Sequence, residues 1–84
     1  MDKKLDVYNI IMKWFSIDNR NILFKCDIEI KNEYIFITLL DLKTFKNVSE
    51  TWLNSFIDEL DLTDVSLYME HLLSKVNKIY DPIA

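Results

Sequence analysis

Few side chains in this sequence could carry out chemistry, and their spacing matches no catalytic pattern. His71 is the only histidine and Cys26 the only cysteine. A histidine acting as a general base needs a nucleophile and an orienting carboxylate beside it, and nothing in the spacing identifies either group. Cys26 belongs to a run of apolar residues that alternate with charged ones, which predicts a buried, unreactive thiol. The sequence therefore predicts no catalytic residue.

Cofactor and metal sites are also not expected. Glycine is absent from the chain, and phosphate-binding loops, dinucleotide-binding turns and hydrolase nucleophile elbows all require it. Asp58, Asp61 and Asp64 are spaced by three, whereas a calcium loop needs ligands at alternate positions around a glycine. One histidine and one cysteine on different elements are too few for a transition-metal site. We expect no cofactor, no metal and no enzymatic activity.

Negative charge is concentrated in the C-terminal half of the chain. The net charge is −4, and the segment from residue 50 to residue 70 contains six carboxylates and no Lys or Arg. Such a segment repels phosphate, which disfavours direct nucleic-acid binding. Asp58 and Glu59 end a predicted helix, where the helix dipole makes negative charge unfavourable. Departures from local rules concentrate at functional sites, so we expect this acidic corner to bind a protein with a basic groove.

The elements that would position these residues follow from hydrophobic periodicity. Residues 2–16 have a narrow polar stripe on an otherwise apolar helix. Residues 24–31 alternate between apolar and charged, and a second run, 34–42, is rich in β-branched and aromatic residues, so the two predict a hairpin. If Asn32 and Glu33 form its turn, the inner face pairs Ile30 with Ile35, Ile28 with Ile37 and Cys26 with Leu39.

The second predicted strand is apolar on both faces. Tyr34, Phe36 and Leu40 fall on the outer face of the hairpin. Because these side chains are largely apolar, we expect another part of the chain or a partner to shield this face from water. A short third strand near residues 42–45, a long helix and a partner are the three alternatives.

Two helices are predicted after the hairpin. Ser49, or Asn47 in a capping box with Glu50, begins the first, and Thr63 caps the second. The second helix stops before Pro82, which restricts the residue before it. The fold class is therefore α+β: an N-terminal helix, an antiparallel hairpin and two C-terminal helices in a single compact domain of residues 1–84.

The cellular location follows from what the sequence lacks. No apolar run approaches the length of a membrane span, residues 1–15 do not resemble a signal peptide, and a lone cysteine suits a reducing compartment. We expect a cytoplasmic protein, and a host-cytoplasmic one if a phage encodes it.

These features favour a small acidic stoichiometric inhibitor or adaptor, of the kind encoded by phages or mobile elements, acting on a host defence or nucleic-acid-handling protein. A homodimeric structural or regulatory subunit is one alternative, and a helix-turn-helix-like nucleic-acid binder, which the acidity disfavours, is another. The residues expected to contact a protein partner are Asp58, Glu59, Asp61, Asp64, Glu70, Tyr34 and Phe36.

Overall fold

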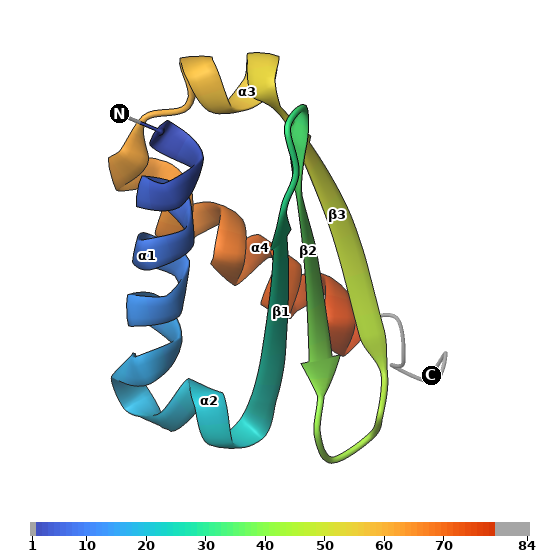
Figure 1. Cartoon of the computed structure of the whole chain (residues 1–84). Helices are drawn as coiled ribbons and strands as arrows, with labels where there is room; N and C mark the ends of the chain where they lie inside the picture. The colour runs from blue at the N-terminus through green and yellow to red at the C-terminus, as the bar shows by residue number, and fades with distance from the viewer. Residues whose placement is uncertain (1, 79–84) are drawn as a thin grey trace.

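The computed structural model describes residues 2–78 and has the predicted α+β architecture (Figure 1). The predicted helix end before Pro82 lies outside the described residues. In chain order the elements are α1 (Lys3–Ser16), the 3₁₀ helix η1 (Ile17–Asn19), α2 (Arg20–Leu23), β1 (Phe24–Ile30), β2 (Tyr34–Asp41), β3 (Asn47–Leu53), α3 (Asn54–Glu59), the 3₁₀ helix η2 (Leu62–Asp64) and α4 (Val65–Lys78).

α1 begins with a side-chain cap and ends at a sharp turn. The Asp2 carboxylate accepts a hydrogen bond from the backbone N–H of Lys4 at 3.0 Å, which satisfies one of the free donors at the helix start. Beyond the helix, Asp18 and Asn19 adopt φ values of 58° and 60°, a region that short Asp and Asn side chains tolerate. The buried residues of α1 are Val7, Ile11, Trp14 and Phe15.

The β1–β2 hairpin has the predicted register. The backbone N–H of Lys31 donates to the Tyr34 carbonyl at 2.8 Å, which leaves Asn32 and Glu33 in the turn. The strands are antiparallel, and the inner face of β2 is fully buried. The confirmed inner-face pairs are Ile30 with Ile35, Ile28 with Ile37 and Cys26 with Leu39.

A third strand exists, but it lies later in the chain than predicted. Residues 42–46 form the turn between β2 and β3 rather than a strand. In this turn the Asp41 carboxylate accepts backbone hydrogen bonds from Lys43 at 2.8 Å and Thr44 at 3.1 Å. β3 then pairs antiparallel with β2, which gives a three-stranded sheet of order β1-β2-β3.

The prediction of a helix beginning at Ser49, or at Asn47 in a capping box, is wrong, because residues 47–53 form β3 and α3 begins only at Asn54. Side chains of β3 alternate between the helix-facing side and the exposed side of the sheet. The sequence does not show this alternation, because the charged residue Glu50 occupies one of the helix-facing positions. Glu50 is accommodated there because its carboxylate accepts a hydrogen bond from Trp52 Nε1 at 2.9 Å and pairs with Lys75 at 3.2 Å.

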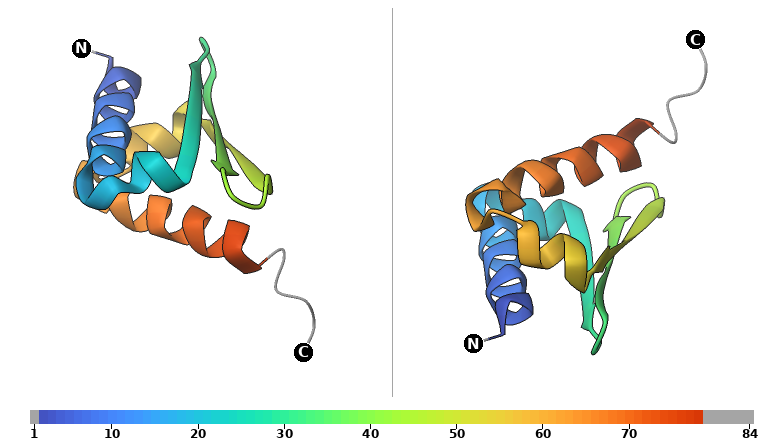
Figure 2. Two further views of the ribbon diagram at one scale, coloured as in Figure 1. Left: turned by 90° about the horizontal axis from the view of Figure 1, so that it is seen from below. Right: turned by 90° about the horizontal axis from the view of Figure 1, so that it is seen from above.

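The helices cover one face of the sheet, with α1 and α4 packed against it (Figure 2). The other face carries Tyr34, Phe36 and Leu40, all half-buried, and no helix within residues 2–78 covers it (Figures 1 and 2). β3 thus flanks the central strand rather than covering its second face. The largest fully buried side chains, which define the core, are Ile11, Ile35, Ile37, Leu39, Ile57, Met69 and Leu72.

Within residues 2–78, no helix combines the length and the apolar character needed to cross a lipid bilayer.

Candidate protein-binding surface

The acidic corner is organised around Asp61, which lies between α3 and η2. Its Oδ1 accepts hydrogen bonds from the Thr63 backbone N–H at 3.0 Å and from the Thr63 hydroxyl at 2.9 Å. Asp61 is therefore the N-cap of η2, and the prediction that Thr63 caps the last helix is wrong, because Thr63 lies inside η2 and α4 begins at Val65. These two hydrogen bonds, the backbone one first, lower the pKa of the Asp61 carboxyl below its usual value of 3.8, and the charge of Lys3 contributes.

A cation from the other end of the chain also reaches this corner. The Lys3 ammonium donates a hydrogen bond to the Asp58 carbonyl at 3.1 Å, so the first turn of α1 is tied to the last turn of α3. That carbonyl belongs to the negative end of the α3 backbone, and Lys3 partly offsets the charge that the sequence places there. Sequence reasoning missed this contact because the partners are 55 positions apart.

Three of the predicted acidic residues line one shallow hollow with two aromatic rings. Its volume is about 270 Å³, and we call it the acidic–aromatic hollow. The Phe56 and Tyr68 rings meet edge to face with their centroids 5.4 Å apart, and both contact the Trp52 ring below them. The residues that line the hollow are Phe56, Glu59, Leu60, Asp61, Asp64 and Tyr68.

The carboxylates of this hollow are available for binding. Glu59, Asp61 and Asp64 are exposed, and none of them forms an ion pair within residues 2–78. The aromatic walls come from α3 and α4, so the two helices and the cap between them position every lining group. Phe56 and Tyr68 were not among the residues predicted to contact a partner, although both line the hollow beside the acidic residues.

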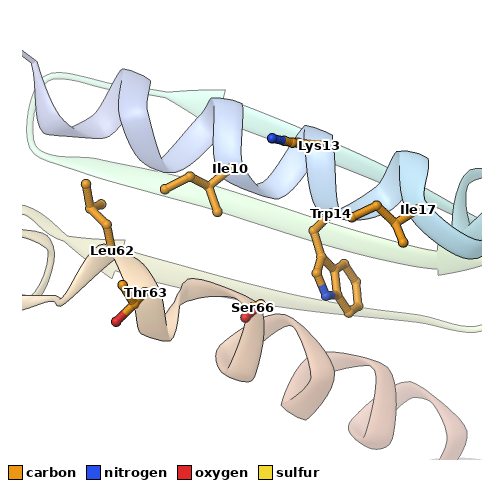
Figure 3. Close-up of a pocket in the computed structure, with 7 residues that line it drawn as sticks. All are labelled: Ile10, Lys13, Trp14, Ile17, Leu62, Thr63 and Ser66. Carbon is orange, nitrogen blue, oxygen red and sulfur yellow. The ribbon is translucent and has the colours of Figure 1, made fainter.

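A second hollow lies on the other side of η2, between α1 and α4 (Figure 3). Its volume is about 410 Å³. The Trp14 ring projects from α1 toward α4, and the Arg20 guanidinium covers this ring at 3.9 Å from its centroid. No carboxylate lines this hollow, and Lys13 is the one charged residue in its otherwise mostly apolar lining. Its lining residues are Ile10, Lys13, Trp14, Ile17, Leu62, Thr63 and Ser66.

The structure does not bring all the predicted contact residues together. Asp58 is exposed in α3, and Glu70 is exposed on α4, but neither lines the two hollows. Tyr34 and Phe36 lie on the outer face of the sheet, away from the helices that carry the acidic residues. The predicted set therefore divides into an acidic surface on the helices and a separate apolar row on β2.

The two residues with reactive side chains lie apart from one another. His71 is exposed on α4, beside Leu67 and Tyr68. Cys26 is half-buried in β1, where burial raises the pKa of its thiol from 9.0 to about 12 and the charge of Asp27 adds to the shift. No group of three His, Cys, Asp or Glu side chains in residues 2–78 could hold a metal ion.

Comparisons with protein families, with curated proteins and with solved structures found no match, so function has to be inferred from these surfaces themselves.

Proposed function

We propose that this chain is a non-enzymatic protein-binding domain, a small acidic inhibitor or adaptor that docks the acidic–aromatic hollow onto a basic surface of its partner. The observation that carries this proposal is the convergence of Glu59, Asp61 and Asp64 with the rings of Phe56 and Tyr68 in one hollow of about 270 Å³.

The chemistry of this hollow suits a lysine or arginine side chain. A cation held against an aromatic ring gains about 0.5–1 kcal/mol at an exposed site. Carboxylates at the rim add charge-assisted hydrogen bonds, and the aliphatic stem of the cationic residue can lie on Leu60 and the rings. A guanidinium is the better fit because it can both stack and form paired hydrogen bonds.

The neighbouring hollow extends the same surface with apolar contacts. Ile17 is 47 % exposed at its rim, and Leu62 is half-buried on η2 between the two hollows. Apolar anchors beside a charged rim are the usual anatomy of a protein interface. The rim charges would mainly accelerate association and select basic partners, so binding should weaken as salt increases.

A partner with a basic groove is the natural target. Proteins that handle nucleic acids present such grooves, which agrees with a phage or mobile-element product that blocks a host defence or nucleic-acid-handling protein in the host cytoplasm. The same negative charge that attracts such a groove disfavours direct nucleic-acid binding by this chain.

The first test is a titration with a short arginine-containing peptide, followed through the ring resonances of Phe56 and Tyr68 by NMR. We expect both rings to shift, and Asp64→Lys to reduce apparent affinity several-fold by replacing attraction with repulsion. Asp64 suits this test because its side chain makes no hydrogen bond or ion pair within residues 2–78. Glu29→Lys, a charge reversal on β1 that removes one exposed ion pair with Lys31, is the control for net charge and should bind like the unmodified protein.

Equal loss of binding in both variants would indicate only the effect of net charge. Ring resonances that stay in place throughout the titration would exclude the hollow as a cation site. In a lysate, a true target should be retained by the unmodified protein and by Glu29→Lys but lost with Asp64→Lys.

A further inference from the structure

β3 is an edge strand, and no strand within residues 2–78 pairs with its outer side (Figure 1). The Asn54 N–H donates to the Glu33 carbonyl at 3.0 Å, and the Asp41 N–H donates to the Lys46 carbonyl at 2.8 Å. Hydrogen-bonded pairs alternate along antiparallel strands, so the even-numbered residues of β3 bond to β2. Residues 47, 49, 51 and 53 therefore direct their backbone N–H and C=O groups away from the sheet.

The opposite edge of the sheet is protected by charge. β1 has ion pairs between Lys25 and Asp27 at 3.9 Å and between Lys31 and Glu29 at 3.8 Å. Charged side chains, lysine above all, are a common means of preventing strand addition at an edge.

β3 lacks this protection. It contains no Lys, Arg or Pro, and its outer-face side chains are neutral. Its one charged residue, Glu50, faces the helices, where Trp52 and Lys75 already bind the carboxylate. A strand approaching this edge therefore meets hydroxyl groups and free backbone groups but no unpaired charge.

We propose that a second copy of this chain occupies this edge, with the two β3 strands pairing antiparallel about a two-fold axis to form one continuous six-stranded sheet. The strand is self-complementary when the axis passes through Thr51. This register places Thr51 opposite its own counterpart, a favourable pair, and Glu50 opposite Trp52 of the second copy, so the two Glu50 carboxylates do not face each other. Leu53, 56 % exposed in the single chain, gains a neighbour.

Pairing of one short strand covers less than the roughly 800 Å² per partner of a typical stable interface. The association should therefore depend on concentration. Sedimentation velocity between about 20 µM and about 1 mM should show a shift from monomer toward dimer over this range. A monomer throughout would overturn the proposal.

Thr51→Pro is the sharpest variant, because residue 51 directs its N–H outward and proline is tolerated at such edge positions. The substitution should abolish dimerisation while leaving the circular dichroism spectrum unchanged. Ser49→Lys should also abolish it by adding a charge to the edge, without any change to the backbone. Asp27→Lys on β1 is the matched control, and it should still dimerise. A dimer that persists in both β3 variants is held by another surface, which would contradict the proposal.

Hydrogen exchange gives an independent readout at single residues. The amides of residues 49, 51 and 53 should become protected only at high protein concentration, whereas those of 48, 50 and 52 should be protected throughout. If the odd-numbered amides exchange freely in a dimer, β3 is not its interface.

Discussion

At the residue scale, the environment of Cys26 determines what its thiol can do. The side chain is half-buried in β1, and the raised pKa keeps it protonated at neutral pH. Because the thiolate is the reactive form, a protonated and partly covered thiol reacts slowly. This agrees with the sequence prediction of an unreactive cysteine, although the residue is less deeply buried than predicted.

Cys26 should make stability depend on pH in the alkaline range. In the unfolded chain its thiol ionises near the ordinary pKa of 9.0, whereas in the folded chain it ionises near 12, so the folded state retains the proton longer. Its contribution to stability is therefore complete below pH 9 and is lost as pH rises toward 12. The free energy of unfolding, measured with urea at increasing pH, should fall more steeply for the unmodified protein than for Cys26→Ala. An equal fall with pH in both proteins would contradict the raised pKa of Cys26.

At the element scale, the hairpin could be predicted and β3 could not. The charged side chains of β1 all fall on its outer face, so its alternation is visible and the register follows from the turn. In β3 the Glu50 carboxylate occupies a helix-facing position, where it is held by a hydrogen bond from Trp52 and by the tertiary contact with Lys75. Ser49 and Glu50 also resemble a helix start, which is a local signal that tertiary pairing overrides.

The start of η2, which leads directly into α4, should depend on the cap at Asp61. Asp61→Ala removes the acceptor for both Thr63 hydrogen bonds and should lower the urea midpoint, whereas Asp61→Asn retains an acceptor and should lower it less. The pKa of Asp61 is lowered in the folded chain, so this contribution is present above pH 3.8 and is lost as pH falls below it.

The same pair of variants separates stability from binding. If the acidic–aromatic hollow binds cations, Asp61→Asn should weaken the arginine-peptide interaction despite its nearly normal urea midpoint. Equal midpoints for Asp61→Ala and the unmodified protein would show that the cap contributes nothing.

At the scale of the whole molecule, one core lies between the helices and a single face of the sheet. Composition alone located the acidic half of the candidate surface, because six carboxylates fall within 21 residues without a basic one. It could not locate Lys3 in that corner, nor show that Tyr34 and Phe36 face away from it, since both facts depend on how α1 and the sheet pack.

Because the core lies on one face of the sheet only, alanine substitutions at neighbouring residues of β2 should lower the free energy of unfolding by unequal amounts. Ile37→Ala empties a fully buried position and should destabilise the fold by about 2–5 kcal/mol. Phe36→Ala, on the uncovered face, should cost only about 1 kcal/mol despite removing a larger side chain. Urea unfolding measures both, and an equally large loss for Phe36→Ala would mean that something covers the outer face in solution.

The lysines of the first α1 turn have a consequence for the order in which the molecule is assembled. Lys3 binds the Asp58 carbonyl, and Lys4 binds the carbonyls of Lys31 and Asn32 at 2.7 Å each. During synthesis α1 leaves the ribosome well before these acceptors, with its apolar face uncovered. Since the chain must reach α3 before the Lys3 contact can form, the first turn of α1 gains its full set of contacts only after most of the chain has been synthesised.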